Sequence, residues 1–229
     1  TGLSQARDGL AATQSSSYGY FGGGYAPPFG WICTIDRIDF SNETVSTPFG
    51  AGNGLSLDRS NLAATSNSSY GYFAGGSSFS PPSVCTIDRL DFSNETISDI
   101  GDLPQARAGL AAVSSSFYGY FGGGEAPPEV CTIARLDFSN ETLSLAGTGL
   151  PQARRFLAAV SNSSYGYFGG GQVPPTNVCT IDRIDFSNET ISTPGTGLSQ
   201  ARNGFAATQS SSYGYFAGGY ADPYVCTID

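Results

Sequence analysis

Five cysteines, one in each copy of an internal repeat, are the first residues in this sequence whose chemistry could matter. They are Cys33, Cys85, Cys131, Cys179 and Cys226. Thiols could form disulfides, bind a metal or act as nucleophiles. Equivalent positions of successive repeats, however, lie farther apart than the roughly 7 Å between Cα atoms that a disulfide tolerates. We therefore expect free cysteines that pack as small buried apolar side chains.

Carboxylates and guanidinium groups also recur in step. Asp36, Asp88 and Asp182 share one strand position, but Ala134 stands there in the third copy, so a metal-binding ring of carboxylates is not expected. One arginine recurs in every copy and one aspartate in four, the arginines being Arg7, Arg59, Arg107, Arg154 and Arg202 and the aspartates Asp39, Asp91, Asp137 and Asp185. We interpret these two sets as buried bidentate pairs that fix the geometry of each repeat. An anion-binding ring of arginines is the alternative.

Several chemistries are excluded by residues that the chain lacks. All ten basic residues are arginine, and there is no lysine, histidine or methionine. The chain therefore has no imidazole base, no histidine metal ligand and no lysine for a Schiff base or a phosphate-binding loop. No cofactor or metal is expected. A net charge of −9 disfavours nucleic acid as a partner, and no apolar run is long enough for a membrane span.

The elements that position these residues repeat five times. The Tyr-Gly-Tyr-Phe unit begins at Tyr18, Tyr70, Tyr118, Tyr165 and Tyr213, and divides the chain into repeats of about 1–48, 49–100, 101–147, 148–195 and 196–229. A period near 47 with glycine-rich punctuation and no helical periodicity predicts an all-β chain built from four-stranded antiparallel propeller blades. The fifth copy lacks its outer strand. The chain is expected to be a single β-propeller domain or part of a longer array.

One copy can be divided strand by strand. In the third repeat, residues 108–115 are small and apolar, as an inner strand near a crowded axis requires. Residues 117–124 are aromatic and end in glycines, and residues 130–138 alternate. The sequence "SNET" is a turn, and residues 142–145 form a short outer strand.

These residues resemble the kelch repeat. The likeness rests on Leu103–Arg107, Gly122–Gly124 and Arg135–Phe138 and on their equivalents in the other copies. It implies a kelch-like β-propeller, although the tryptophan that usually follows the turn is absent. The motif "YGYFGGG" also resembles repeats of kelch-like proteins predicted from aquatic viruses and environmental sequences. The histidines of the copper site in some kelch-fold oxidases have no counterpart in this chain.

The aromatic unit itself is interpreted as architecture. Aromatic residues that return in every blade are typical of the packing between blades, because they bury large apolar areas. The glycines that follow could approach a phosphate, but neither a lysine nor a helix start comes after them.

The segments that differ between copies are the candidate binding surface. The loops after the second strand and the links after the outer strand should lie at one end of the blades. The aromatic residues on them are Tyr25, Phe29, Trp31, Phe49, Phe79, Tyr220 and Tyr224, and the acidic ones are Glu125, Glu129, Asp99 and Asp102. Exposed aromatics on proline-stiffened loops suit binding of a protein or a glycan. The alternative is that they cap the ends of the blades.

The Asn-Glu-Thr turns match the sequence for N-glycosylation. The acceptors would be Asn42, Asn94, Asn140 and Asn188, with Asn67 and Asn162 in "NSS" as further matches. Asparagine also suits turns with a left-handed conformation, which is the structural alternative.

Three functions remain open at this point. The first is a non-catalytic binding or adhesion module in a surface-displayed or virion protein, which implies an extracellular or virion location. The second is a structural subunit that associates with itself through the incomplete last blade. The third is a kelch-fold or sialidase-like enzyme that uses acid pairs at the loop end.

Overall fold

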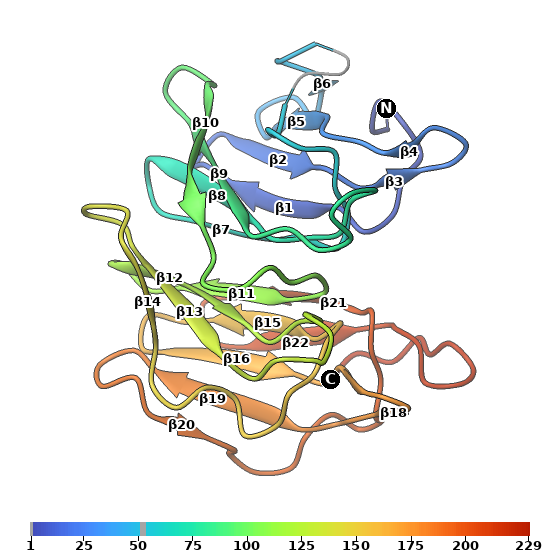
Figure 1. The fold of residues 1–229 in the computed structure, drawn as a ribbon, viewed down its shortest axis with the longest axis vertical. Coiled ribbons are helices and arrows are strands. Elements are labelled where there is room, and N and C mark those ends of the chain that lie inside the picture. Colours follow the sequence, from blue (N-terminus) through green and yellow to red (C-terminus); the bar gives the residue numbers. More distant parts are fainter. Residues whose placement is uncertain (1, 51–53) are drawn as a thin grey trace. The chain divides into compact units, whose positions relative to one another are not determined.

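The computed structural model describes residues 2–50 and 54–229, and their regular structure consists of β-strands (Figure 1). The chain divides into two compact units, Thr1–Ala108 and Gly109–Asp229, which we call unit 1 and unit 2 and describe separately. No helix that could cross a membrane occurs in the described part.

Unit 1 contains two four-stranded antiparallel blades. The first runs in the order β1 (Ala11–Gln14), β2 (Tyr18–Gly22), β5 (Ile35–Asp39) and β6 (Val45–Ser46). The second consists of β7 (Ala63–Ser66), β8 (Tyr70–Ala74), β9 (Thr86–Asp91) and β10 (Ile97–Asp102). A small hairpin of β3 (Tyr25–Ala26) and β4 (Gly30–Trp31) extends from the loop between β2 and β5.

Unit 2 contains two further blades of the same kind. They are β11 (Ala111–Ser114), β12 (Tyr118–Gly122), β13 (Ile133–Asp137) and β14 (Leu143–Leu145), followed by β15 (Ala158–Ser161), β16 (Tyr165–Gly169), β19 (Ile181–Asp185) and β20 (Ile191–Ser192). A small hairpin pairs β17 (Gln172–Val173) with β18 (Thr176–Asn177). The prediction of four-stranded antiparallel propeller blades is confirmed.

The fifth repeat does not form a fifth blade. It forms a sheet of two strands, β21 (Ala206–Gln209) and β22 (Gly214–Ala217). The following segment adds an isolated bridge between Ala217 and Ile228 in place of a regular third strand. The count of complete blades is therefore four.

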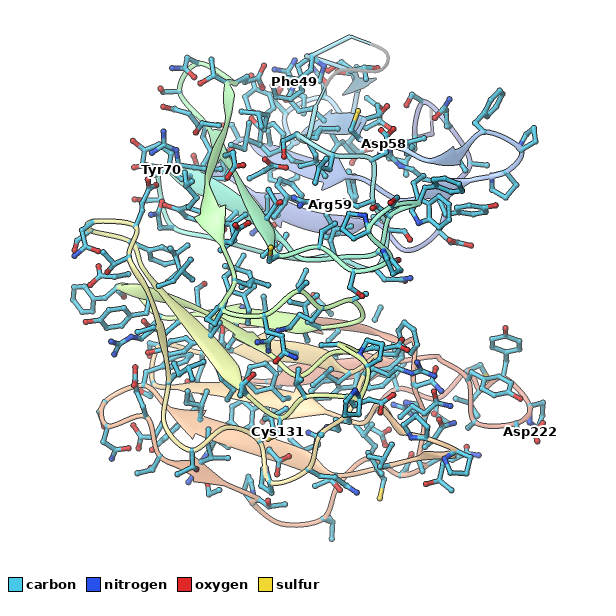
Figure 2. The ribbon with its side chains drawn as sticks, viewed as in Figure 1. Phe49, Asp58, Arg59, Tyr70, Cys131 and Asp222 are labelled. Atoms are coloured by element: carbon cyan, nitrogen blue, oxygen red, sulfur yellow. The ribbon has the colours of Figure 1, made fainter. Side chains whose placement is uncertain are left out.

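Each blade has two ends that matter for function. The turn between its first and second strands and the Asn-Glu-Thr turn between its third and fourth strands share one end, which we call the hairpin end. The loop between the second and third strands and the link to the next blade share the other, which we call the loop end. In unit 1, Tyr70 lies at the hairpin end and Asp58 at the loop end (Figure 2).

The core between blades uses the repeated aromatics, as predicted. In unit 1, Tyr20 and Phe73 are fully buried in one cluster with Leu62 and Leu90. The absence of a side chain at Gly22 leaves room for the Phe73 ring, because a Cβ at Gly22 would lie 2.7 Å from Phe73 Cε1. Burial of one such ring contributes about 1.5–3 kcal/mol to stability.

The buried arginines pair with a different set of aspartates from the one predicted. Arg59 Nη2 bonds Asp88 Oδ2 at 2.8 Å, and both side chains are fully buried. The equivalent pairs are Arg7–Asp36, Arg154–Asp182 and Arg202–Asp229. Each of these four arginines also donates to the carbonyl of the phenylalanine that ends the Tyr-Gly-Tyr-Phe unit. Figure 2 shows Arg59 in the interior of unit 1.

The predicted counter-ring has a separate role in turns. Asp39 Oδ1 accepts hydrogen bonds from the backbone N–H (2.8 Å) and hydroxyl (2.6 Å) of Ser41. These bonds hold the pKa of Asp39 below its usual value. Asp91, Asp137 and Asp185 make the same turn. Pairing these four aspartates with the arginines was wrong.

A contact at the hairpin end joins neighbouring blades in both units. In unit 1, the Phe92 ring stacks on Tyr20 at 5.4 Å and 12°, and Glu95 accepts a hydrogen bond from the Tyr20 hydroxyl at 3.0 Å. Arg37 Nη1 pairs with the same carboxylate at 2.7 Å. We call this arrangement the hairpin clamp, because the phenylalanine and glutamate of one Asp-Phe-Ser-Asn-Glu-Thr hairpin close on the preceding blade.

Unit 2 repeats the hairpin clamp. Phe186 stacks on Tyr120 at 5.2 Å and 11°, and Glu189 accepts from the Tyr120 hydroxyl at 3.2 Å and from Arg135 at 2.8 Å. The glutamate of the Asn-Glu-Thr turn therefore has a packing function that its match to the glycosylation sequence does not reveal.

Within the described ranges the five cysteines form no disulfide, as expected, but two of them are not buried. Cys33, Cys85 and Cys131 are partly buried, whereas Cys179 and Cys226 are exposed. The prediction of five buried thiols was wrong for Cys179 and Cys226 and holds only in part for the other three. Burial, followed by a hydrogen bond to Asp58, raises the pKa of Cys33 to about 11.

Candidate binding site

An aromatic groove at the loop end of unit 1 is the strongest candidate site. The β3–β4 hairpin places Tyr25 opposite Trp31, and their rings meet edge to face at 5.3 Å. Phe79, from the corresponding loop of the second blade, meets Trp31 edge to face at 6.3 Å. Three of the predicted residues from two different blades therefore come together.

The hairpin that carries these rings is tied to the body of unit 1. Tyr25 exchanges two backbone hydrogen bonds with Asp8, at 3.1 and 2.9 Å. Gly30 has a φ of 91°, which a residue with a side chain rarely adopts, and it closes the turn after the two prolines. Phe29 at the tip of this turn is 75% exposed.

The groove has an apolar rim and a few polar groups. Its volume is about 500 Å³, and it is lined by Phe29, Gly30, Trp31, Leu57, Asp58, Ser78, Phe79 and Ser80. Phe79 is 86% exposed, although a side chain of this type is usually buried. Asp58 is the single charged residue among those that line the groove, and no arginine accompanies it. The groove therefore suits a ligand that is neutral or positively charged and that offers an apolar face to the rings.

Phe49 does not belong to this groove. It is half-buried and packs against the core cluster that contains Leu55 and Ile35. It does not line the aromatic groove, and its part in binding stays a prediction.

Tyr220 and Tyr224 form a separate pair in unit 2. Their rings meet edge to face at 5.1 Å, and Tyr224 is 81% exposed. Asn177 donates to the Tyr220 carbonyl at 2.9 Å, and Tyr220 also exchanges backbone hydrogen bonds with Asn203. The pair lies at the loop end of unit 2.

The acidic loop residues of unit 2 are neutralised by a neighbouring arginine. Arg155 Nη1 lies 2.5 Å from Glu125 Oε2 and 3.7 Å from Glu129 Oε1, and Arg155 Nε also bonds Gln172 at 3.1 Å. Both carboxylates of this loop are therefore engaged by one guanidinium, and neither lines the aromatic groove of unit 1.

The acidic residues on β10 are also set apart from the aromatic groove. Asp99 accepts a hydrogen bond from the Gly101 backbone at 2.8 Å, and Asp102 bonds the Cys85 thiol. Across the described ranges 2–50 and 54–229, no group of three or more cysteine, aspartate or glutamate side chains is placed to hold a metal ion.

The Asn-Glu-Thr asparagines lie exposed at the hairpin end of their blades. In each, the asparagine Oδ1 accepts from the backbone and hydroxyl of the threonine two residues later, as in Asn42 with Thr44 at 2.9 and 2.7 Å. Asn94, Asn140 and Asn188 do the same. Glycosylation of these asparagines stays a prediction.

Two equivalent grooves at the hairpin end were not foreseen from the sequence. The groove of unit 1, about 400 Å³, lies between the serine turns before Tyr18 and Tyr70 and is floored by Asp91–Ser93. The groove of unit 2, about 360 Å³, is lined by the corresponding residues around Tyr118, Tyr165 and Phe186. The runs "SSS" and "NSS" before each aromatic unit were the available signal.

Comparisons with known proteins bear on the fold. No protein-family model and no curated protein matches the chain. YjhT is a similar solved structure. It aligns with this chain at a TM-score of 0.80 and 13% identity, over 96% of this chain and 74% of the YjhT chain. The agreement with YjhT supports the β-propeller fold alone, since one fold can carry many functions. The resemblance to kelch repeats and to viral proteins stays a prediction.

Proposed function

We propose that this chain is a non-catalytic binding module that recognises a neutral glycan through the aromatic groove of unit 1. The observation that carries the proposal is the meeting of Tyr25, Trp31 and Phe79 from two blades, with Phe29 and Phe79 left exposed. Aromatic rings offer flat apolar area at a low cost in conformational entropy.

The polar groups of the groove favour a glycan over an apolar protein segment. A sugar presents an apolar C–H face to a ring and hydroxyl groups around its edge. Ser78, Ser80 and Asp58 line the same groove and can exchange hydrogen bonds with such hydroxyls. The lack of a basic residue in the lining, together with the net charge of −9, disfavours an acidic sugar.

An enzymatic role finds less support. The candidate acids Glu125 and Glu129 share Arg155, and the sequence has no histidine or lysine to act as a base near neutral pH. We therefore favour binding over catalysis, with display outside a cell or on a virion surface. The exposed Asn-Glu-Thr turns support this location, and a mass shift on enzymatic deglycosylation of the protein from its natural source would test it.

The proposal is tested by screening the full chain on an array of neutral and acidic glycans, followed by calorimetric titration of the best hit. Phe79→Ala and Trp31→Ala should each weaken binding by about tenfold or more, the size of effect typical of a central aromatic contact. Tyr224→Ala, which removes an exposed ring from unit 2, is the matched control and should bind as the parent chain does.

Thermal melting of each variant shows whether weaker binding comes from a lost contact or from lost folding. The control matters most for Trp31→Ala, because Trp31 is half-buried whereas Phe79 is almost fully exposed. Binding to acidic glycans alone, or equal affinity of Phe79→Ala and the parent chain, would overturn the proposal. Binding to a protein but to no glycan would make the chain a protein-binding module, the other kind of ligand that the sequence left open.

A further inference from the structure

The groove at the hairpin end of unit 2 differs from its counterpart in unit 1 by one aromatic ring. Phe117 stands where the other four repeats have serine, at Ser17, Ser69, Ser164 and Ser212. It lines the groove, meets the Tyr118 ring edge to face at 6.5 Å and is 72% exposed. The groove beside it sets Phe117 apart from a single exposed apolar residue and favours a role in ligand binding.

The turn that carries Phe117 has the same hydrogen bonds as a turn with serine at this position. Ser115 Oγ accepts from the backbone N–H groups of Phe117 at 3.3 Å and of Tyr118 at 3.1 Å. In the first repeat Ser15 Oγ accepts from Ser17 and from the next residue, at 3.3 and 3.0 Å. The ring can therefore be removed, or transferred to unit 1, without a change in the turn.

Hydroxyl groups line the groove beside the ring. Ser116 comes from the third blade, and Ser163 and Ser164 come from the fourth. All three serines are exposed, so their hydroxyl groups are open to a ligand. Each can donate one hydrogen bond and accept two, which suits a ligand that carries hydroxyl groups of its own.

Asp185 adds a charged acceptor. Its Oδ1 accepts from the backbone N–H of Ser187 at 2.9 Å and from the hydroxyl at 2.6 Å, and these bonds hold the pKa of Asp185 below its usual value. In the described part of the chain they use Oδ1 alone, so Oδ2 can accept from a ligand. None of the described residues that line the groove is basic, and Arg183 nearby stacks on the Tyr165 ring. This composition disfavours an anionic ligand.

We infer that this groove binds one residue of a neutral sugar, with its C–H face on the Phe117 ring and its hydroxyl groups on Ser164 and Asp185. The volume of about 360 Å³ lies near the lower end of the range of about 300–1,000 Å³ that is typical of ligand pockets, so it suits a short ligand. Both walls of the groove belong to unit 2. Binding here does not depend on the loop-end groove of unit 1.

Unit 1 supplies a built-in comparison. Its hairpin-end groove has serines and Asp91 at the corresponding positions, but Ser17 replaces the ring. We therefore expect the groove of unit 1 to bind the same sugar at least about tenfold more weakly, the size of effect typical of a central aromatic contact.

The test is a titration of the full, isotopically labelled chain with methyl glycosides of neutral hexoses, followed by the NMR shifts of its backbone amides. The chain is produced without glycosylation, because Asn162 and Asn188 adjoin the groove residues Ser163 and Ser187. Shifts that depend on sugar concentration should appear at residues 115–118, 163–165 and 185–187. Because the amides report each groove separately, a failure here is distinguishable from a failure of the loop-end groove.

Three variants show whether the ring carries the binding. Phe117→Ser should weaken binding in the groove of unit 2 by about tenfold or more, and Ser17→Phe should strengthen binding in the groove of unit 1. Phe79→Ala, which removes an exposed phenylalanine at the loop end, is the matched control and should leave both hairpin-end affinities unchanged. Circular dichroism confirms that every variant is folded.

Three results would overturn the inference. One is that no neutral glycoside shifts the groove amides at the highest soluble concentration. Another is equal affinity of Phe117→Ser and the parent chain, since the ring would then take no part in binding. The third is that a methyl glucuronide, which carries a carboxylate, shifts the groove amides and the neutral glycosides do not.

Discussion

The hydroxyl of Tyr20 donates to the carboxylate of Glu95 across 3.0 Å, although the two residues are 75 positions apart and belong to neighbouring blades. The tyrosine is fully buried, and the glutamate side chain is 24% exposed. The bond therefore joins a core aromatic to an Asn-Glu-Thr turn, which the sequence indicated only as a possible glycosylation site.

Removal of this bond should destabilise the chain measurably. We expect Tyr20→Phe to lower the free energy of unfolding by about 1–2 kcal/mol, because a hydrogen bond to a charged group is lost while the ring still packs. Urea denaturation followed by tryptophan fluorescence would measure the change. Glu43→Gln, which changes the exposed glutamate of the equivalent turn in the first blade, is the control, and an equal loss in both variants would show that the Tyr20–Glu95 bond contributes nothing.

The same tyrosine makes stability sensitive to high pH. Burial, with the Glu95 carboxylate as a second cause, raises the pKa of Tyr20 above its usual value near 10. The unfolded state then loses the phenolic proton at a lower pH than the folded state does. The contribution of Tyr20 is fully present below about pH 10 and falls as pH rises further. Stability curves at pH 8 to 11 should therefore slope less steeply for Tyr20→Phe than for the parent chain, and parallel curves would contradict this.

The Arg59–Asp88 pair should be costly to break from one side. Asp88→Ala leaves a fully buried guanidinium without its carboxylate, so we expect a loss of about 3–5 kcal/mol in unfolding free energy. Asp91→Ala removes only a turn acceptor from the same strand and should cost clearly less. Chemical denaturation would measure both losses. A loss of similar size in both variants would show that the buried pair contributes no more to stability than the turn hydrogen bonds of Asp91 do.

Gly22 should tolerate no larger side chain while Phe73 is present. A Cβ at Gly22 would lie 2.7 Å from the fully buried Phe73 ring, so Gly22→Ala should cost about 1–3 kcal/mol through overpacking. The backbone at Gly22 is not left-handed, so the loss would come from the ring contact. The double variant with Phe73→Leu should recover part of the loss, and the absence of any recovery would point to another cause.

The five thiols should differ in their reactivity. Cys179 and Cys226 are exposed, whereas burial and the Asp58 hydrogen bond raise the pKa of Cys33 to about 11. Because the thiolate is the nucleophile, iodoacetamide at pH 8 should modify the two exposed cysteines first and Cys33 last. Peptide mass spectrometry over time would follow the order. Asp58→Asn should speed the modification of Cys33, and early labelling of Cys33 in the parent chain would contradict the assignment.

Much of the fold was available from repetition. The five Tyr-Gly-Tyr-Phe units and their spacing predicted four-stranded blades with the aromatics between them, and the buried Tyr20 and Phe73 confirm this. The candidate site was only partly predictable. Trp31 and Phe79 do meet, but Phe49 packs against the core cluster from its edge and Tyr224 lies in unit 2. Loop conformation depends on contacts that no periodic pattern records.

The sequence by itself determined the four-stranded blade as the repeating element, because a pattern repeated five times leaves few ways to bury the same side chains. Only the tertiary structure decided which charges pair. Asp36 and Asp39 both follow the repeat, but strand register places Asp36 opposite Phe21, whose carbonyl Arg7 also binds, and Asp39 opposite Tyr18. Residues an odd number apart on a strand face opposite sides, so Asp36 reaches the buried arginine and Asp39 does not.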